Sequence, residues 1–284
     1  MKKSTKIFLG AILLLGISLA FYDWRLAAEF RKGDYTDPYY NYTKLNYRDF
    51  DEIELRSGSS FSVMVTQGDY KVLVHPQASE FAIVRQEGKR LIIEAHFPDH
   101  FRGVNAAHTI YVACPALSVF SVDAKYTVGS ETLTDYANWD FRWFPTMIRG
   151  FKQDSLTILE DHASNLVLEC DRIGRLTAVV GMGGAINGVR SDGAGRPSPG
   201  QPMVKDKIGA GVRESGAGGE RESILSGPAL TIGQGNHFES SDLNILYQGQ
   251  LRITGTDIRQ LTFHLADSAI LTVNGVAAHY LNLH

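Results

Sequence analysis

Four aspartates in the C-terminal half form two pairs, Asp161 with Asp171 and Asp257 with Asp267, and the members of each pair are ten residues apart. Paired carboxylates suit glycoside cleavage, because one group donates a proton while the other acts as base or nucleophile. This chemistry requires the two carboxyl groups to lie within about 10 Å of each other. The pairs are catalytic candidates only if the backbone brings both members to one face.

Large apolar residues recur with the same ten-residue spacing, and a second apolar residue usually follows two positions later. This alternation predicts short strands separated by turns. Two strands with their turns make about 20 residues, a length typical of one coil of a solenoid. We therefore predict an all-β fold, a right-handed β-helix-like β-solenoid; the alternative is an antiparallel β-sandwich. The repeating positions are Leu156, Leu166, Leu176 and Ile186, then Leu251, Leu261, Leu271 and Leu281.

A coil of about 20 residues places side chains ten positions apart on opposite sides of the coil. The aspartate pairs then fail the distance requirement, and aspartates that form turns explain the pattern better. The serines around Gly58 lack the strand-to-helix elbow of a hydrolase nucleophile and also indicate a turn. We predict no catalytic residue and a protein that is not an enzyme.

Four residues between His96 and His108 invite a metal hypothesis. A His-x3-His spacing such as that of His96 and His100 binds metal when it lies on a helix, but Pro98 and the surrounding strand pattern argue against a helix. We predict a polar loop that includes Asp99 and no metal site. The glycine clusters lack the lysine spacing of a phosphate loop, so no cofactor is predicted.

The segment 131–153 contains four aromatic residues within six positions, Trp139, Phe141, Trp143 and Phe144. Aromatic faces suit sugars or an apolar partner surface, so these four are the binding residues that the sequence suggests. The alternative is a flap that covers one end of the solenoid core.

The first 25 residues have the features of an export signal. Three lysines precede Ile7–Phe21, a run of 15 residues without a charge. This length suits a signal peptide, whereas extension to Trp24 gives a short signal anchor with its basic end in the cytoplasm. Either alternative predicts an exported protein, periplasmic or at the cell surface, anchored to the inner membrane if the segment is retained. The net charge of −3 gives no reason to expect a nucleic-acid partner.

Two cysteines, Cys114 and Cys170, belong to the exported part. An oxidising compartment allows one disulfide between them. The alternative is that both are small buried residues of strands.

The remaining boundaries follow from composition. Residues 26–48 are polar and rich in tyrosine, which indicates a tether, and 49–130 alternate as a β domain. The solenoid is predicted over 154–284 with an insertion at 187–229, where eight glycines fall between Gly193 and Gly219. Few apolar residues there offset the entropy of an ordered backbone.

Residues 49–128 carry several short motifs in a fixed order: a Phe-x-x-Ile strand, a strand that ends in Gln-Gly-Asp, a Leu-x-Ile strand and a Val-x-x-Pro-x-Leu step into the solenoid. In order they are Phe50–Leu55, Phe61–Asp69, Leu91–Ile93, Ile110–Val112 and Cys114–Val122. This order resembles the auto-transporter adhesin family with the head GIN domain. The resemblance implies an exported β-solenoid domain of a bacterial envelope, and it implies no catalytic residue. The chain is too short to include an autotransporter pore as well.

These observations lead to two functional hypotheses. The first is a non-enzymatic envelope protein that presents a binding or adhesion surface to a glycan, a lipid or an envelope protein. The second is a carbohydrate-active lyase or hydrolase on the same scaffold, which a compact cluster of carboxylates beside Arg or Lys on one solenoid face would favour. The chain ends on a strand-like Leu281–Leu283, and an uncovered end of this kind favours self-association.

Overall fold

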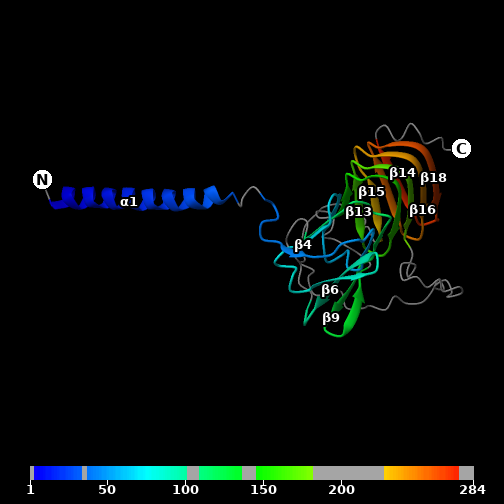
Figure 1. Ribbon diagram of the computed structural model, residues 1–284, viewed down its shortest axis with the longest axis horizontal. Coiled ribbons are helices and arrows are strands. Elements are labelled where there is room, and N and C mark those ends of the chain that lie inside the picture. The colour runs from blue at the N-terminus through cyan, green and yellow to red at the C-terminus, as the bar shows by residue number, and fades with distance from the viewer. Residues whose placement is uncertain (1–2, 34–36, 101–108, 136–144, 182–226, 275–284) are drawn as a thin grey trace, which may run out of the picture. The chain divides into compact units, whose positions relative to one another are not determined.

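The computed structural model describes residues 3–33, 37–100, 109–135, 145–181 and 227–274 (Figure 1). It divides into two compact units, Met1–Tyr42 and Thr43–His284. The first unit contains one helix, and the second is built from strands.

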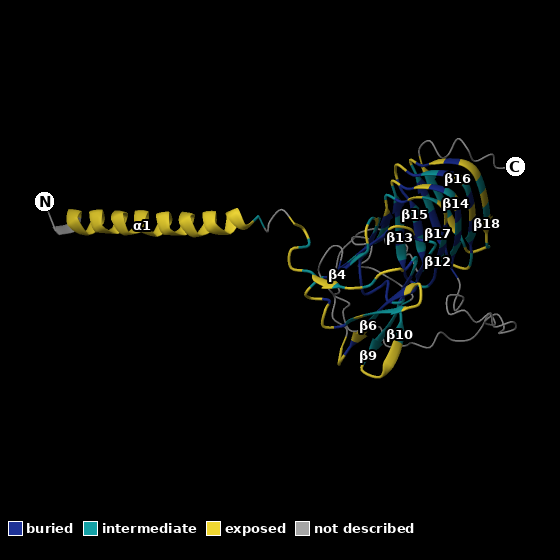
Figure 2. Cartoon of the chain, viewed as in Figure 1, coloured by how far each residue is buried: buried dark blue, intermediate teal, exposed yellow. Residues whose placement is uncertain are grey.

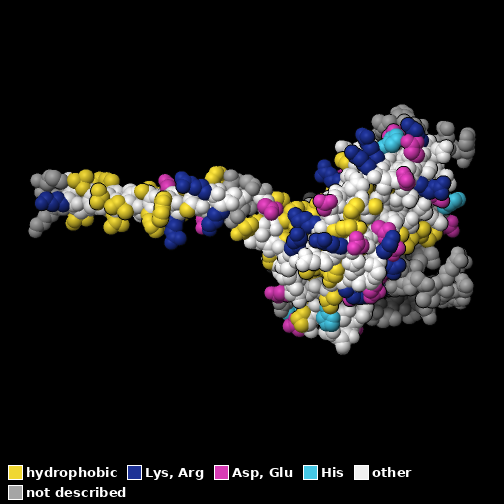
Figure 3. Space-filling view, viewed as in Figure 1, with side chains coloured by type: hydrophobic (Ala, Val, Ile, Leu, Met, Phe, Trp, Pro, Cys, Tyr) yellow, Lys and Arg dark blue, Asp and Glu magenta, His cyan; other side chains and the backbone are white. Residues whose placement is uncertain are grey.

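Helix α1 (Lys3–Lys32) is 30 residues long, and its large apolar side chains are exposed (Figures 2 and 3). At 1.5 Å per residue such a helix is longer than the roughly 30 Å hydrocarbon core of a bilayer. Residues Thr5–Lys32 are long and apolar enough to cross a membrane. A signal sequence has the same properties, so α1 fits both the signal and the anchor of the sequence prediction.

The second unit consists of two long sheets. Sheet A has nine strands in the order β1 (Thr43–Leu45), β4 (Lys71–Val74), β7 (Ile110–Cys114), β3 (Val63–Gln67), β11 (Thr146–Arg149), β13 (Asn165–Glu169), β15 (Ala229–Ile232), β17 (Gln250–Thr254) and β19 (Ile270–Asn274).

Sheet B has ten strands, of which nine lie side by side and the tenth, β5 (Ala82–Glu87), pairs with β6 off this row. The order of the nine is β10 (Glu131–Thr134), β9 (Lys125–Val128), β6 (Arg90–Phe97), β2 (Glu52–Leu55), β8 (Val119–Val122), β12 (Lys152–Glu160), β14 (Arg172–Val180), β16 (His237–Ile245) and β18 (Asp257–Leu265).

The strands from β11 onward alternate between the sheets and pair in parallel with the strand one coil away. Leu156 lies beside Leu176 in sheet B, and Leu251 lies beside Leu271 in sheet A. Successive steps of the ten-residue spacing therefore fall on alternate sheets, and one coil takes about 20 residues, as predicted. This parallel register excludes the antiparallel sandwich for the described strands between 146 and 274.

The two sheets continue into the N-terminal half, where each sheet also contains antiparallel pairs of strands. Strand β2 pairs in parallel with β6 and β8, while β5 with β6, β1 with β4 and β9 with β10 are antiparallel. The structure thus places 43–284 in one unit, and the finer division at 130 and 154 stays a prediction.

One hydrophobic core runs through the whole second unit (Figure 2). Alternate residues of each strand point inward, as Leu156 and Ile158 do on β12. The wider N-terminal part is filled by phenylalanines, and Phe81 packs between Phe61 and Phe97 with ring centroids 5.8 and 4.7 Å away. Buried aromatic side chains contribute a large share of the stabilising area in such a core.

The insertion of the sequence prediction replaces one tight turn of the solenoid. Strands β14 and β15 are connected by 181–228, whereas β12 and β13 are connected by 161–164. The described ends of this connection, Gly181 and Gly227, have φ values of +88° and +115°. A Cβ atom at Gly227 would overlap the carbonyl oxygen of Gln248, so both conformation and space require glycine there.

Strands β18 and β19 form the last coil that the structure describes. Phe263 and Leu271 point inward but are only half-buried, whereas Leu243 and Leu251 one coil earlier are fully buried. Residues Leu281–Leu283 lie outside the described residues. Self-association at this end stays a prediction.

Candidate functional site

A pocket in the described part of the chain lies where β2 ends and β9 takes over its place beside β6. The chain leaves β8 and crosses the end of β2, since the amide of Asp123 donates to the carbonyl of Leu55 (2.9 Å) and that of Lys125 to the carbonyl of Arg56 (2.8 Å). Strand β9 then pairs with the far half of β6, through His96 and Phe97. This crossing places side chains from β2, β6, β9 and β10 around one hollow.

The hollow has a volume of about 230 Å³. Pockets for drug-sized ligands are about 300–1,000 Å³, so this one admits a single ring or headgroup of a larger ligand. Its lining is mainly polar and includes carboxylates, basic groups and hydroxyls. The lining residues are Glu54, Leu55, Arg56, Ser57, Glu94, Ala95, Asp123, Lys125, Tyr126, Thr127 and Thr132.

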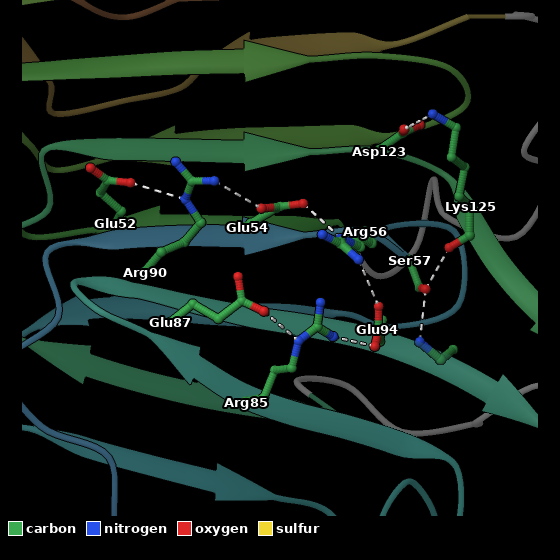
Figure 4. Close-up of polar contacts among 11 residues, drawn as sticks. Glu52, Glu54, Arg56, Ser57, Arg85, Glu87, Arg90, Glu94, Asp123 and Lys125 are labelled. Atoms are coloured by element: carbon green, nitrogen blue, oxygen red, sulfur yellow. Dashed lines mark hydrogen bonds and ion pairs between the residues drawn. The ribbon is translucent and has the colours of Figure 1, made fainter. Parts of the chain in front are cut away.

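A row of alternating charges, here called the charged ladder, crosses sheet B on the β2 and β6 side of the pocket (Figure 4). Figure 4 shows the guanidinium of Arg56 between Glu54 and Glu94, to which it donates at 2.7 and 3.1 Å. Arg90 pairs with Glu54 at 3.4 Å, and Arg85 pairs with Glu94. The ladder holds the carboxylates in fixed positions at the pocket.

These ion pairs matter most for Glu54, because its side chain is only 8% exposed. A carboxylate that is buried to this extent is stable in its charged form only with partners that replace water. Burial by itself lowers the pKa of Arg56, but the hydrogen bonds and charges of Glu54 and Glu94 raise it overall. The guanidinium of Arg56 therefore keeps its positive charge beside the two carboxylates.

Asp123 also lines the pocket, and it has two basic partners. Lys125 donates to its Oδ2 at 2.7 Å, and Nδ1 of His162 lies 2.6 Å from its Oδ1. Burial raises the pKa of Asp123, but the hydrogen bonds and charges of His162 and Lys125 outweigh this effect and lower it overall. Asp123 is thus a carboxylate in the folded protein.

The β9–β10 hairpin contributes the hydroxyl groups of the pocket. Thr127 and Thr132 lie opposite each other across the hairpin. Among the described residues neither hydroxyl has a hydrogen-bond partner. The ring of Tyr126 meets Phe97 edge to face at 6.0 Å, and its hydroxyl bonds Asp135 at 3.2 Å, which anchors the hairpin on the core.

Two further carboxyl groups with shifted pKa values lie in the solenoid core, away from the pocket lining. Burial raises the pKa of Glu160 to about 8 and that of Asp171 to about 7. Ser164 donates to Glu160 at 3.1 Å, and the amide of Phe151 donates to Asp171 at 2.8 Å. Both groups close corners of the coil, so we assign them to the architecture.

The aspartates of the sequence analysis lie where the coil geometry predicts. Asp161 and Asp171 are buried at opposite corners of one coil, Asp267 is in an exposed turn, and Asp257 opens β18 and pairs with His237. The four aromatic residues Trp139, Phe141, Trp143 and Phe144 and the histidine His108 lie outside the described residues, so their roles stay predictions.

Neither cysteine is part of a disulfide in the structure. Cys114 is buried at the end of β7, and Cys170 is exposed in the turn between β13 and β14. Sheet A places β3 and β11 between these strands, and three strand spacings amount to about 14 Å. A disulfide needs Cα atoms within about 7 Å, which this separation excludes. Burial raises the pKa of the Cys114 thiol to about 12.

Within the described ranges no group of three or more His, Cys, Asp or Glu side chains could hold a metal ion. His100 pairs with its neighbour Asp99 at 2.8 Å, and His96 is exposed on β6. The pocket itself was missed by sequence reasoning. The alternation of Glu52, Glu54 and Arg56 signals a polar outer face, but its partners are 36–38 residues away on another strand.

Comparisons with known proteins give structural likeness at low identity. No family model matches the chain, and no curated protein matches it. A crystal structure described as a putative adhesin from Parabacteroides distasonis is 10% identical, with 81% of this chain and 95% of that chain covered and a TM-score of 0.34. A second putative adhesin, from Parabacteroides merdae, is 9% identical, with 82% and 95% covered and a TM-score of 0.25.

A third crystal structure, described as a putative lipid binding protein from Parabacteroides distasonis, is 11% identical, with 81% and 96% covered and a TM-score of 0.22. At these TM-scores the superpositions do not establish a common fold. The assignment of the solenoid rests on the register of this chain's own strands.

Proposed function

We propose that the chain is an exported, non-enzymatic envelope protein that presents a binding surface. In this proposal α1 directs export and tethers the protein to the inner membrane, with its lysine-rich start in the cytoplasm. The unit 43–284 then lies outside and offers the pocket at the end of β2. We further propose a right-handed winding, because connections between parallel strands have that hand in nearly all proteins.

The observation that carries the proposal is the pairing of every charged side chain in the pocket lining. Glu54, Arg56 and Glu94 are linked in the charged ladder, and Asp123 is linked to Lys125. A general acid or base must exchange its proton near the working pH, which such pairing opposes. Fixed pairs instead provide donors and acceptors that are already oriented for a ligand, and this arrangement supports binding.

Among the ligand classes that suit an envelope protein, a glycan fits the pocket better than a lipid chain or a protein surface. The lining has few apolar side chains for an acyl chain, and the hollow is too small for a typical protein interface. Hydroxyl groups can accept from Arg56 or Lys125 and donate to Glu94 in the same complex.

A second candidate function has one observation in its favour. Three carboxylates, Glu54, Glu94 and Asp123, line one pocket together with Arg56 and Lys125. A cluster of this composition is the arrangement expected of a carbohydrate-active lyase or hydrolase. A carbohydrate assay therefore has to measure cleavage as well as binding.

The test uses residues 43–284, because the hydrophobic core lies entirely within this unit. The protein is incubated with purified envelope glycans, and both retention of the glycan and the release of new chain ends are measured. We expect retention without release. Release that disappears in a folded Asp123→Asn variant would replace this proposal with the enzyme hypothesis.

A further inference from the structure

We propose that the pocket recognises an uncharged, hydroxyl-rich ring, which means a neutral sugar residue, and that it discriminates against anionic and cationic sugars. This inference rests on the proposed function, and it adds the ligand class and the residues that select it. The argument uses the charge balance of the lining, the free hydroxyls on the hairpin and the size of the hollow.

The charge balance opposes a charged ligand. A ligand carboxylate that binds Arg56 competes with Glu54 and Glu94, which already bond its guanidinium at 2.7 and 3.1 Å. A ligand amine that binds Asp123 competes with Lys125 at 2.7 Å and with His162 at 2.6 Å. Either ligand leaves one partly buried protein charge without its partner, which is unfavourable.

A neutral hydroxyl does not have this effect. It accepts one hydrogen bond and donates another, so it can bridge a basic group and a carboxylate without separating them. Carboxylate oxygens have about four lone-pair sites in total, and the ladder uses only some of them. Hydrogen bonds to charged groups are also the stronger kind, which suits a small contact area.

The β9–β10 hairpin supplies two threonine hydroxyls that a polyol can bond. Thr127 and Thr132 face each other across β9 and β10, and both line the pocket together with Glu54 and Arg56. Their hydroxyls have no partner among the described residues, so a ligand can use both. They lie outside the charged ladder, and their removal leaves every ion pair of the pocket intact.

The size of the hollow limits the ligand to one ring at a time. A volume of about 230 Å³ is below the usual range for a whole drug-sized molecule. A sugar at the end of a glycan, or one ring of a polymer, can enter while its neighbours remain in solvent. We therefore expect weak affinity for a free monosaccharide, since only a few groups form contacts.

The experiment compares sugars that share a ring and differ in charge. The full chain in phosphocholine micelles is titrated with methyl glucoside, methyl galactoside and N-acetylglucosamine, and then with glucuronate and glucosamine. Phosphocholine micelles are used because detergents with sugar headgroups would compete. Saturation-transfer NMR and calorimetry report the dissociation constants. We expect at least one neutral sugar to bind about tenfold more tightly than both charged sugars.

The double variant Thr127→Val, Thr132→Val tests the location of the site. Valine keeps the branched shape that suits a strand and replaces the hydroxyl by a methyl group, which forms no hydrogen bond. Loss of two hydrogen bonds lowers the affinity for the neutral sugar about tenfold. The matched control is Thr177→Val, on the outer face of β14, which should leave binding unchanged. Thermal unfolding of both variants shows that they are folded.

Each contrary outcome removes a defined part of the inference. Tighter binding of glucuronate or glucosamine overturns the ligand class but leaves the proposed binding function in place. Unchanged binding in the threonine double variant overturns the site. If no sugar of the panel binds, the inference is wrong, and the proposed function then depends on the separate retention assay with purified glycans.

Discussion

Replacement of Asp171 by asparagine should stabilise this protein. Asp171 is fully buried at a corner of the coil, where its Oδ1 accepts from the amide of Phe151 at 2.8 Å. Among the described residues its Oδ2 has no hydrogen-bond partner. The same corner of the next coil has Asn236, whose Oδ1 accepts from the amide of Asp171 at 2.8 Å and whose Nδ2 donates to two carbonyls. Asparagine has the same shape as aspartate and carries no charge.

The magnitude follows from the pKa of this carboxyl group. Burial raises the pKa of Asp171 from its ordinary value of 3.8 to about 7. Each pKa unit corresponds to about 1.4 kcal/mol, so the difference amounts to about 4 kcal/mol in the free energy of unfolding. The folded state binds the proton more tightly than the unfolded state. The contribution of the protonated Asp171 to the free energy of unfolding is therefore fully present below about pH 4 and is lost as the pH rises through about 7.

The assay is urea unfolding of residues 43–284 at several pH values between 4 and 8. We expect the Asp171→Asn variant to match the wild type near pH 4 and to exceed it by a few kcal/mol at pH 8. Other titrating groups, among them Glu160, are present in both proteins and cancel in the difference. The matched control is Asp154→Asn, an exposed aspartate on β12, which should show no such trend.

Two results would refute this reasoning. A stability difference that is the same at pH 4 and pH 8 would show that Asp171 does not retain its proton in the folded state. A less stable variant at pH 8 would show that the carboxylate makes contacts that the amide cannot replace.

Three further predictions concern the backbone, the thiols and the helix. Gly227→Ala should lower the free energy of unfolding by more than about 3 kcal/mol, because strain at its φ of +115° adds to overlap with the next coil. Gly88 has a φ of +60° and open space around it, so Gly88→Ala should cost only about 1 kcal/mol. Thermal unfolding of the two variants compares these costs. A thiol reagent should modify Cys170 in the folded protein and Cys114 only after unfolding, as mass spectrometry would show; a folded protein without reactive thiol contradicts this. The full chain should sediment with membranes and 43–284 should not.

Much of the architecture follows from the order of apolar residues. Leucines ten residues apart, with an apolar residue two positions later, require alternate side chains to be buried, and only strands achieve that. The parallel register of Leu156 with Leu176 confirms a coil of about 20 residues. The apolar run after the N-terminal lysines likewise predicts an exposed membrane-type helix, because no polar face allows it to pack on a soluble core.

At the corners of the coil, the sequence pattern predicts the position of a side chain but not its burial. The sequence predicts that aspartates ten residues apart lie at opposite corners, and Asp161 and Asp171 do so. It contains no signal that Asp171 is buried with a raised pKa, because burial depends on the coils stacked above and below it. Likewise the separation of Cys114 and Cys170 depends on the order of strands in sheet A, which local patterns do not encode.

The sequence by itself determines the strand period and the inward or outward direction of the strand side chains, since these depend on neighbours a few positions away. The pocket was decided only by the tertiary structure. Arg56 meets Glu94 across 38 residues and His162 meets Asp123 across 39. Arg56 meets Glu94 because β2 pairs with β6, and His162 meets Asp123 because β12 pairs with β8. A charge on an outward position gives no indication of which distant strand will supply its partner.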